Sequence, residues 1–181
     1  MKNAIFLLLL LALVVSCKKD DPCDGVTCEN NGSCVDGSCA CIGLWRGEKC
    51  TEQITPLLIS IRQMTNTKFP ATDNNGAGWD LTSGPDIYFI MKQSGTTILS
   101  SQDNFIQNAS VGASWTFNLS IVFPKEPITI EMWDYDDFDS DDFMGAVTGV
   151  VYTDTNGFPT LINLDCGICP VAFSLSNISY L

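Results

Sequence analysis

Apolar residues in the stretch 54–181 occur in short runs and not in a helical repeat. Residues 116–121 (Thr-Phe-Asn-Leu-Ser-Ile) alternate between polar and apolar positions, as a half-buried antiparallel strand does. Turn signals, such as Ser94-Gly95, Asn156-Gly157 and Asn74-Asn75-Gly76, separate the runs. This pattern predicts an all-β sandwich, with strands at 57–64, 86–92, 115–123, 128–133, 144–152 and 171–178.

The first residues predict an export signal, which is not part of the fold. Lys2 precedes an apolar run at 5–15 that is too short to span a bilayer comfortably, and Ser16 comes just before Cys17. The segment resembles a bacterial lipoprotein signal, which implies a signal peptide at 1–16 and a lipidated Cys17. The alternative is ordinary cleavage, which leaves Cys17 as an odd thiol. Residues 18–21 (Lys-Lys-Asp-Asp) are similar to the acidic export signal of Bacteroidetes-type surface lipoproteins, which implies an exported protein anchored by lipid at the outer membrane or cell surface.

Charge and composition exclude several functions. The formal net charge is −12, so no basic face is expected to bind nucleic acid or to attract anionic lipid. Membrane contact by the globular part would need a bridging cation or apolar loop tips. The chain has no histidine, which excludes Ser-His-Asp and Cys-His catalysis and the common zinc sites.

Six of the nine cysteines fall in residues 23–50, a segment too short to bury a core. Without Cys17 the total is eight, an even number that suits an oxidising compartment and disfavours zinc. The spacing, with Asn31-Gly32-Ser33-Cys34 and Gly47-x-x-Cys50, resembles an EGF-like domain over 23–51, after a linker at 17–22. Six cysteines alone permit fifteen pairings; the resemblance implies Cys23–Cys34, Cys28–Cys39 and Cys41–Cys50. We interpret the module as a disulfide-rich spacer, with ligand recognition as the alternative.

Two acidic loops leave predicted strands. Asp80 and Asp86 lie six residues apart, and Asp134-x-Asp136 is followed six residues later by Asp142. Two carboxylates about 4 Å apart repel by roughly 4 kcal/mol at an effective dielectric near 20. Such loops therefore need a cation, protonation or a splayed geometry. Brought to one end of a sheet, they would form an oxygen-rich site that suits Ca²⁺; the alternative is a solvated acidic loop.

The segment 132–145 (Met-Trp-Asp-Tyr-Asp-Asp-Phe-Asp-Ser-Asp-Asp-Phe-Met-Gly) resembles the third calcium loop of C2 domains. Asp80 with Asp86-Ile87-Tyr88 resembles the first, although Ile87 replaces the usual proline. Over 54–181 this resemblance implies an antiparallel C2-like β-sandwich of eight strands. It also implies Ca²⁺ bound by five aspartates, namely Asp80, Asp86, Asp134, Asp136 and Asp142.

Three further positions near these loops have two interpretations each. The resemblance implies that Phe138 inserts into lipid; the alternative is a side chain folded back on the sandwich. Asp139 is either an extra metal ligand or solvated. Trp79 is either a second membrane anchor or a core tryptophan, and we favour the core. Asp137 replaces a residue that is basic in many relatives, which weakens contact with acidic lipid.

Cys166 and Cys169 are expected to form a local disulfide, because no helix start is signalled for redox chemistry and a metal site lacks partners. Together these features predict a calcium-dependent binding module of a surface lipoprotein, with a phospholipid, protein or glycan ligand. The alternative is a structural or adhesive protein in which calcium only rigidifies the domain and the EGF-like module mediates contacts. No enzymatic activity is expected. Paired carboxylates can cleave glycosides, but the metal-like spacing argues against that role.

Overall fold

The structure is a computed structural model, which describes residues 20–181 except 74, 81–82 and 139. The predicted signal peptide at 1–16, Cys17 and Asp139 therefore lie outside the described residues. The chain divides into two compact units, with the boundary between Glu52 and Gln53. None of the helices in the described ranges is long and apolar enough to cross a bilayer.

The first unit contains two short antiparallel pairs. Strands β1 (Ser33–Val35) and β2 (Ser38–Ala40) form a hairpin, and its turn residues Asp36 and Gly37 have φ angles of 48° and 84°. Positive φ at both positions is typical of a type I′ turn. Strands β3 (Trp45–Arg46) and β4 (Glu52–Gln53) make the second pair.

Disulfides take the place of a hydrophobic core in this unit. Cys50 is the one buried residue between positions 20 and 52. The structure links Cys23 with Cys34, Cys28 with Cys39 and Cys41 with Cys50, which is the pairing that the EGF-like resemblance implies. Three cross-links in so short a segment restrict the unfolded chain, and this restriction stabilises a fold that buries little apolar surface.

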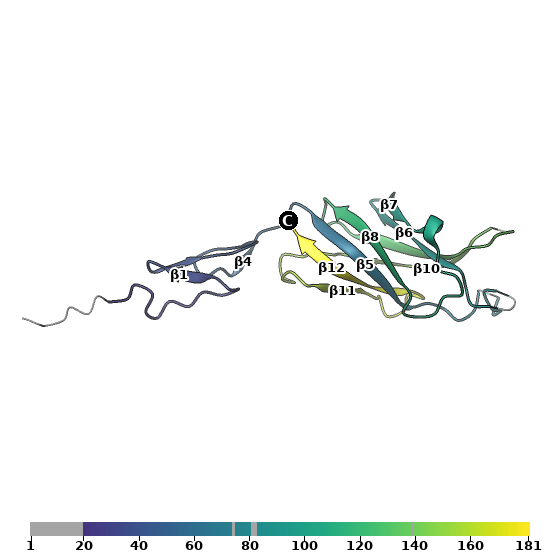
Figure 1. The fold of residues 1–181 in the computed structure, drawn as a ribbon, viewed down its shortest axis with the longest axis horizontal. Helices are drawn as coiled ribbons and strands as arrows, with labels where there is room; N and C mark the ends of the chain where they lie inside the picture. The colour runs from purple at the N-terminus through teal and green to yellow at the C-terminus, as the bar shows by residue number, and fades with distance from the viewer. Residues whose placement is uncertain (1–19, 74, 81–82, 139) are drawn as a thin grey trace, which may run out of the picture. The chain divides into compact units, whose positions relative to one another are not determined.

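The second unit is a sandwich of two four-stranded antiparallel sheets, in the orders β10-β9-β6-β7 and β11-β12-β5-β8 (Figure 1). The predicted all-β fold with eight strands is confirmed. The strands are β5 (Ile59–Lys68), β6 (Ile87–Gln93), β7 (Thr96–Ser100), β8 (Ser114–Ile121), β9 (Ile128–Asp134), β10 (Asp142–Gly149), β11 (Leu161–Leu164) and β12 (Ala172–Tyr180). A short 3-10 helix, η1 (Gln102–Asn104), is the sole helix among the described residues.

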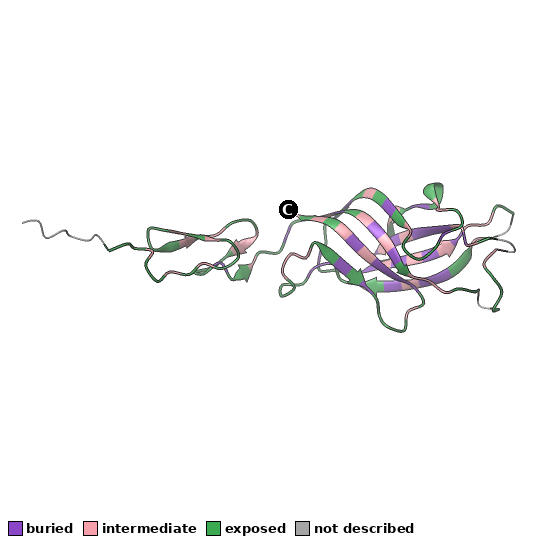
Figure 2. Cartoon of the chain, turned by 60° about the horizontal axis from the view of Figure 1, so that its bottom comes forward, coloured by how far each residue is buried: buried purple, intermediate pink, exposed green. Residues whose placement is uncertain are grey.

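The core lies between the two sheets, where buried residues line the inner strand faces (Figure 2). Strand β9 shows why the chain folds this way. Its residues Ile128, Ile130 and Met132 are fully buried and alternate with less buried ones, as the two-residue period of a strand requires. The next inward position is Asp134, which is only 1% exposed. An acidic side chain thus ends the apolar row of this strand.

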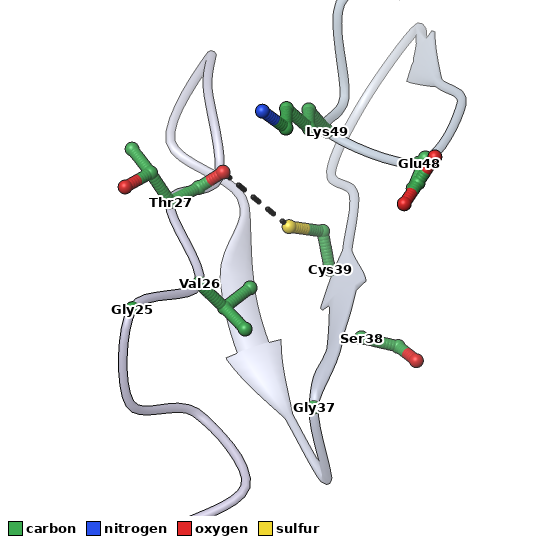
Figure 3. Close-up of a pocket in the computed structure, with 8 residues that line it drawn as sticks. All are labelled: Gly25, Val26, Thr27, Gly37, Ser38, Cys39, Glu48 and Lys49. Atoms are coloured by element: carbon green, nitrogen blue, oxygen red, sulfur yellow. Dashed lines mark hydrogen bonds between the residues drawn. The ribbon is translucent and has the colours of Figure 1, made fainter.

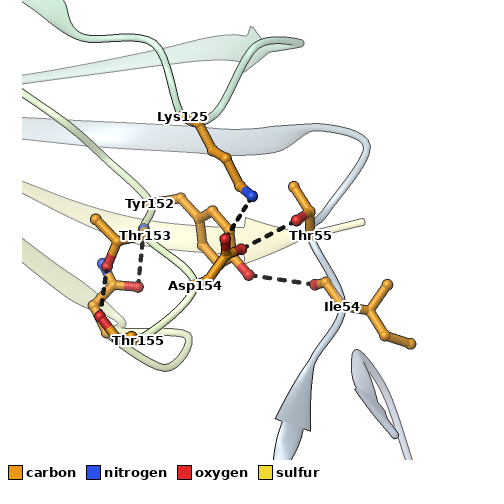
Figure 4. Close-up of polar contacts among 8 residues, drawn as sticks. Ile54, Thr55, Lys125, Tyr152, Thr153, Asp154 and Thr155 are labelled. Atoms are coloured by element: carbon orange, nitrogen blue, oxygen red, sulfur yellow. Dashed lines mark hydrogen bonds and ion pairs between the residues drawn. The ribbon is translucent and has the colours of Figure 1, made fainter.

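One end of the sandwich is closed by polar contacts from loops (Figure 4). The carboxylate of Asp154 accepts a hydrogen bond from Lys125 Nζ at 2.6 Å and one from the Thr55 hydroxyl at 3.2 Å. Nearby, the backbone groups of Leu58 and Leu181 exchange two hydrogen bonds, of 3.0 and 3.1 Å. Both Ile59, where β5 begins, and Ile128, where β9 begins, lie at this end, so the end of β9 at Asp134 lies at the other.

Candidate metal centre

Three strand ends bring the predicted acidic residues together. Asp134 is the last residue of β9, and its register partners are Ile87, the first residue of β6, and Asp142, the first residue of β10. Asp86 immediately precedes β6. Because the three strands run antiparallel, both acidic loops emerge at the same end of this sheet. The two loops are therefore neighbours, as the sequence predicts.

Asp134 is the central residue of this cluster. Its Oδ1 accepts a hydrogen bond from the backbone N–H of Asp86 at 2.7 Å, whereas its buried Oδ2 has no partner among the residues that the structure describes. Burial is the main cause that raises the pKa of Asp134 from its ordinary value of 3.8 to about 6. The Asp86 N–H lowers this pKa, and the carboxylates of Asp80, Asp136 and Asp86 raise it. All three acids are therefore close enough to repel a charge on Asp134.

The first acidic loop is held by hydrogen bonds from within the loop and from two other segments. Asp86 Oδ1 accepts from the backbone N–H of Asn108 at 2.8 Å, and Asp80 Oδ2 accepts from the Ser83 hydroxyl at 3.1 Å. The carbonyl oxygen of Asp86 also accepts from the N–H of Tyr135 at 2.7 Å. Asp86 is thus fixed by the second loop and by the segment that carries Asn108.

The second loop is organised by Asp141, which the sequence analysis did not single out. Its Oδ1 accepts from the backbone N–H of Asp136 at 3.2 Å, and its Oδ2 accepts from the Tyr88 hydroxyl at 2.7 Å and from Gln102 Nε2 at 3.0 Å. Burial, and then Asp141, raise the pKa of Tyr88 far above its ordinary value, so the phenol stays a donor. No sequence signal separates Asp141 from its acidic neighbours, because its partners lie on distant segments.

A bulge in β10 lies just after the end of the second loop. The register of β10 with β9 shifts between Phe143 and Gly145. Gly145 has a φ of +144°, and a Cβ atom at this position would lie 2.4 Å from Pro170 Cγ. Pro170 directly follows the disulfide between Cys166 and Cys169. The local disulfide loop therefore packs against the strand that carries Asp142.

The aromatic residues near the loops differ in exposure. Phe138 is fully exposed and does not fold back on the sandwich. Trp79 is partly buried against the core, and its Nε1 donates to the Pro70 carbonyl oxygen at 2.7 Å. This is the core position favoured for Trp79 from the sequence. Asp137, next to Phe138, is also exposed.

The donor set suits a hard cation. All five predicted ligands offer carboxylate oxygens, which calcium prefers, and a buried carboxylate oxygen without a partner calls for a water or an ion. In this arrangement, however, no group of three or more acidic side chains among the described residues is close enough to hold an ion. Asp134 is buried while Asp142 is exposed, so an ion shared by these ligands requires some of their side chains to change position.

A separate cavity lies in the disulfide-rich unit (Figure 3). It has a volume of about 400 Å³ and is lined in part by Gly37, Ser38, Glu48 and Lys49. Its walls carry one acidic and one basic side chain and no aromatic ring. This mixed lining does not define a ligand class.

No protein-family model matches the chain, and no curated protein matches it. Solved structures with a similar fold include "Structure of a C2 domain", at 15% identity and a TM-score of 0.46, which covers 67% of this chain and 97% of that one. Another is the calcium-bound pair of C2 domains of Extended-Synaptotagmin 2, at 18% identity and a TM-score of 0.42, with 67% and 46% covered. A third is human GIVD cytosolic phospholipase A2, at 15% identity and a TM-score of 0.44, which covers 70% of this chain and 17% of that one. These similarities concern the fold alone. Any inference about the function of this chain must therefore rest on its own side chains.

Proposed function

We propose that residues 54–181 form a calcium-dependent binding module, with Asp80, Asp86, Asp134, Asp136 and Asp142 as the metal ligands. The observation that carries the proposal is the buried Asp134 carboxylate, whose Oδ2 has no partner among the described residues and whose pKa is raised by three other carboxylates. A buried acceptor left unpaired costs about 1–3 kcal/mol. A cation removes this cost and reverses the repulsion between the loops.

Four of the five side chains then have a defined part in binding. Asp86 and Asp134 are already joined through a hydrogen bond, so they supply the rigid half of the site. Asp136 lies on the loop whose fold depends on Asp141, and Asp142 begins the strand that follows this loop, so they supply the half that closes. Bound calcium supplies the positive charge that draws the two halves together and offers a coordination position to an anionic or hydroxyl-bearing ligand.

The ligand that we favour is a phospholipid, bridged through the ion to its phosphate. The exposed Phe138 side chain supports this choice because an apolar tip beside the metal can enter the lipid interface. A protein or a glycan is the second possibility, since the net charge of −12 opposes direct contact with anionic membranes.

A second candidate function is a structural or adhesive role, in which calcium only rigidifies the domain and residues 23–51 make the contacts. Under this alternative, the cavity of about 400 Å³ in that unit would be available for such contacts. Removing residues 23–50 while keeping the anchor should abolish cell adhesion under this alternative. Adhesion should persist if the calcium module makes the contacts.

We also propose that the protein is exported and anchored by lipid on Cys17 at the outer membrane or cell surface. The proposal is supported by the apolar run at 5–15 followed by Cys17. Metabolic labelling with palmitate should label the wild-type chain and leave Cys17→Ser unlabelled. Equal labelling of both would contradict it.

Calorimetric titration of the full chain with CaCl₂ tests the metal site. We expect saturable binding with a Kd on the order of 10⁻⁴–10⁻³ M, the range of extracellular modules. Asp136→Asn should weaken the binding at least tenfold, whereas Asp103→Asn, an exposed acid on η1, should leave it unchanged. Absence of saturable heat in the wild type would refute the site.

A further inference from the structure

A small cavity lies beside the proposed metal site and shares one residue, Asp142, with it. It has a volume of about 260 Å³ and is lined by Asp73, Asn75, Trp79, Asp142 and Phe143. Four of these five residues are not proposed calcium ligands. The volume is below the range of about 300–1,000 Å³ that drug-sized ligands occupy, so the cavity suits a single head group.

The hydrogen-bonding capacity left in this lining consists mainly of acceptors. Trp79 Nε1 already donates to the Pro70 carbonyl oxygen at 2.7 Å, and Asn75 Nδ2 donates to Asp73 Oδ2 at 3.2 Å. Asp73 Oδ1 accepts from the backbone N–H groups of Ala77 and Asn75, at 2.7 and 2.9 Å. These bonds fix the Asp73 carboxylate and lower its pKa, with the Ala77 N–H as the largest cause. A carboxylate has room for about four donors, so acceptor capacity remains.

The charge of the lining favours a cationic ligand. Two of its five residues are aspartates, and none of the described lining residues is basic. In a chain of net charge −12 such a cavity repels anions and attracts cations. The rings of Trp79 and Phe143 add faces that attract a positive charge.

We propose that this cavity binds the primary ammonium group of a lysine side chain on a partner protein. An ammonium group has three donors and no acceptor, which complements a lining rich in acceptors. A quaternary ammonium has no N–H to give to Asp73 and Asp142. A sugar hydroxyl is both donor and acceptor, and among the described lining residues only the second N–H of Asn75 Nδ2 remains as a side-chain donor for it. The apolar stem of lysine can lie along the two rings.

The same chemistry favours a protein over a lipid source. The ammonium of an ethanolamine lipid is two carbons from a phosphate, and binding it here would bring that phosphate against the carboxylates of Asp73 and Asp142. The stem of lysine carries no such charge. A basic partner would also be steered toward this acidic surface.

Amide NMR of the full chain in EGTA, titrated with Nα-acetyl-lysine methylamide, tests the proposal without calcium. We expect millimolar affinity, with shifts at Asn75, Gly76 and the Trp79 indole. The Nε-acetyl analogue, which lacks the charge, should bind at least tenfold more weakly. The Nε-trimethyl analogue, which keeps the charge but has no donors, should bind several-fold more weakly.

Variants locate the site. Asp73→Asn keeps the acceptor for the Ala77 N–H and removes the charge, so it should weaken binding of the lysine probe at least fivefold. Phe143→Leu removes an aromatic ring from the lining, so it should weaken binding of the probe several-fold. Asp165→Asn is the matched control, because Asp165 Oδ1 also accepts a backbone N–H, from Gly167 at 2.8 Å, outside the cavity. Equal losses in both Asp→Asn variants would show non-specific attraction and overturn the proposal.

Other results would also overturn it. These are equal binding of the acetylated analogue, tighter binding of the trimethyl analogue, absence of shifts around Asn75, and O-phosphoethanolamine binding as tightly as the lysine probe. The calcium proposal would be untouched by these outcomes, because the CaCl₂ titration tests it separately.

Discussion

The Oδ1 atom of Asp134 lies 2.7 Å from the backbone nitrogen of Asp86, while Oδ2 of the same carboxylate is buried and has no partner in the described part of the chain. One oxygen therefore joins two strands, and the other is available for a cation. The unpaired Oδ2 destabilises the metal-free protein, and under the proposed function the same oxygen would bind the cation.

The stability of the metal-free protein should depend on pH through Asp134. Its folded-state pKa of about 6 exceeds the ordinary value of 3.8, so the folded state binds the proton more tightly. The contribution to the free energy of unfolding is full below about pH 4 and is lost as pH rises through 6, by about 1–3 kcal/mol. Urea unfolding in EGTA at several pH values, compared between wild type and Asp134→Asn, isolates this group; parallel curves would contradict the assignment.

Asp134→Asn should stabilise the metal-free protein at pH 7 and abolish its response to calcium. The amide keeps an oxygen for the Asp86 N–H but removes a buried charge, which should raise the free energy of unfolding by about 1–2 kcal/mol. In the wild type, calcium at about 100 times its Kd should add roughly 2.7 kcal/mol. Thermal melts with EGTA and with CaCl₂ measure both effects, and a calcium-induced rise in the Tm of the variant would show that Asp134 is not a ligand.

Tyr88→Phe should weaken calcium binding without removing a ligand. It deletes the hydroxyl that donates to Asp141, so the second loop loses a support worth about 1 kcal/mol, or roughly fivefold in Kd. Tyr180→Phe is the control, because it deletes a similar bond, to the Pro159 carbonyl oxygen at 2.7 Å, at the other end of the sandwich. Calorimetry should show the loss in the first variant alone; equal Kd values would exclude a positioning role for Tyr88.

Gly145→Ala should destabilise the sandwich by about 1–3 kcal/mol. The new Cβ would lie 2.4 Å from Pro170 Cγ, in a backbone conformation with φ of +144°. Pro170→Ala in the same chain should restore part of the loss, because the clash would be relieved while the backbone strain remained. Urea unfolding of both single variants and the double variant measures this coupling. Additive losses would show that the two residues do not interact.

Phe138→Ala should reduce calcium-dependent binding to phosphatidylcholine vesicles several-fold and leave the Tm unchanged, because the side chain is fully exposed. Vesicle sedimentation with CaCl₂ and with EGTA is the measurement. Calcium-independent sedimentation of both proteins would exclude the lipid ligand and leave the metal site intact.

Strands in which polar and apolar residues alternate could be predicted from the sequence. The alternation at 116–121 and the buried run at 128–133 correspond to β8 and β9. Strands β7 and β11 were missed: Thr96–Ser100 has one edge without a neighbour and no fully buried residue, and Leu161–Leu164 is only four residues long. The strand predicted at 144–152 instead spans Asp142–Gly149, because a bulge lets pairing begin before Gly145.

The acidic spacing predicted which loops meet, because strand direction places both at one sheet end. It did not predict which carboxylate is buried. That depends on Asp134 falling at the fourth inward position of β9, which only the register of the sheet fixes. The role of Asp141 depends on Tyr88 and Gln102, and contacts between such distant segments leave no local pattern in the sequence.

The adjacency of Leu58 and Leu181 has a mechanical consequence. Strands β5 and β12 run antiparallel and are paired from Ile59 with Tyr180 onward. A pulling force applied at Leu58 and Leu181 would act perpendicular to the two strands. It would break the hydrogen bonds between them one pair after another, beginning at the pulled end. Traction along this direction should therefore open the sandwich at low force, and the acidic loops at the far end would be the last part to separate.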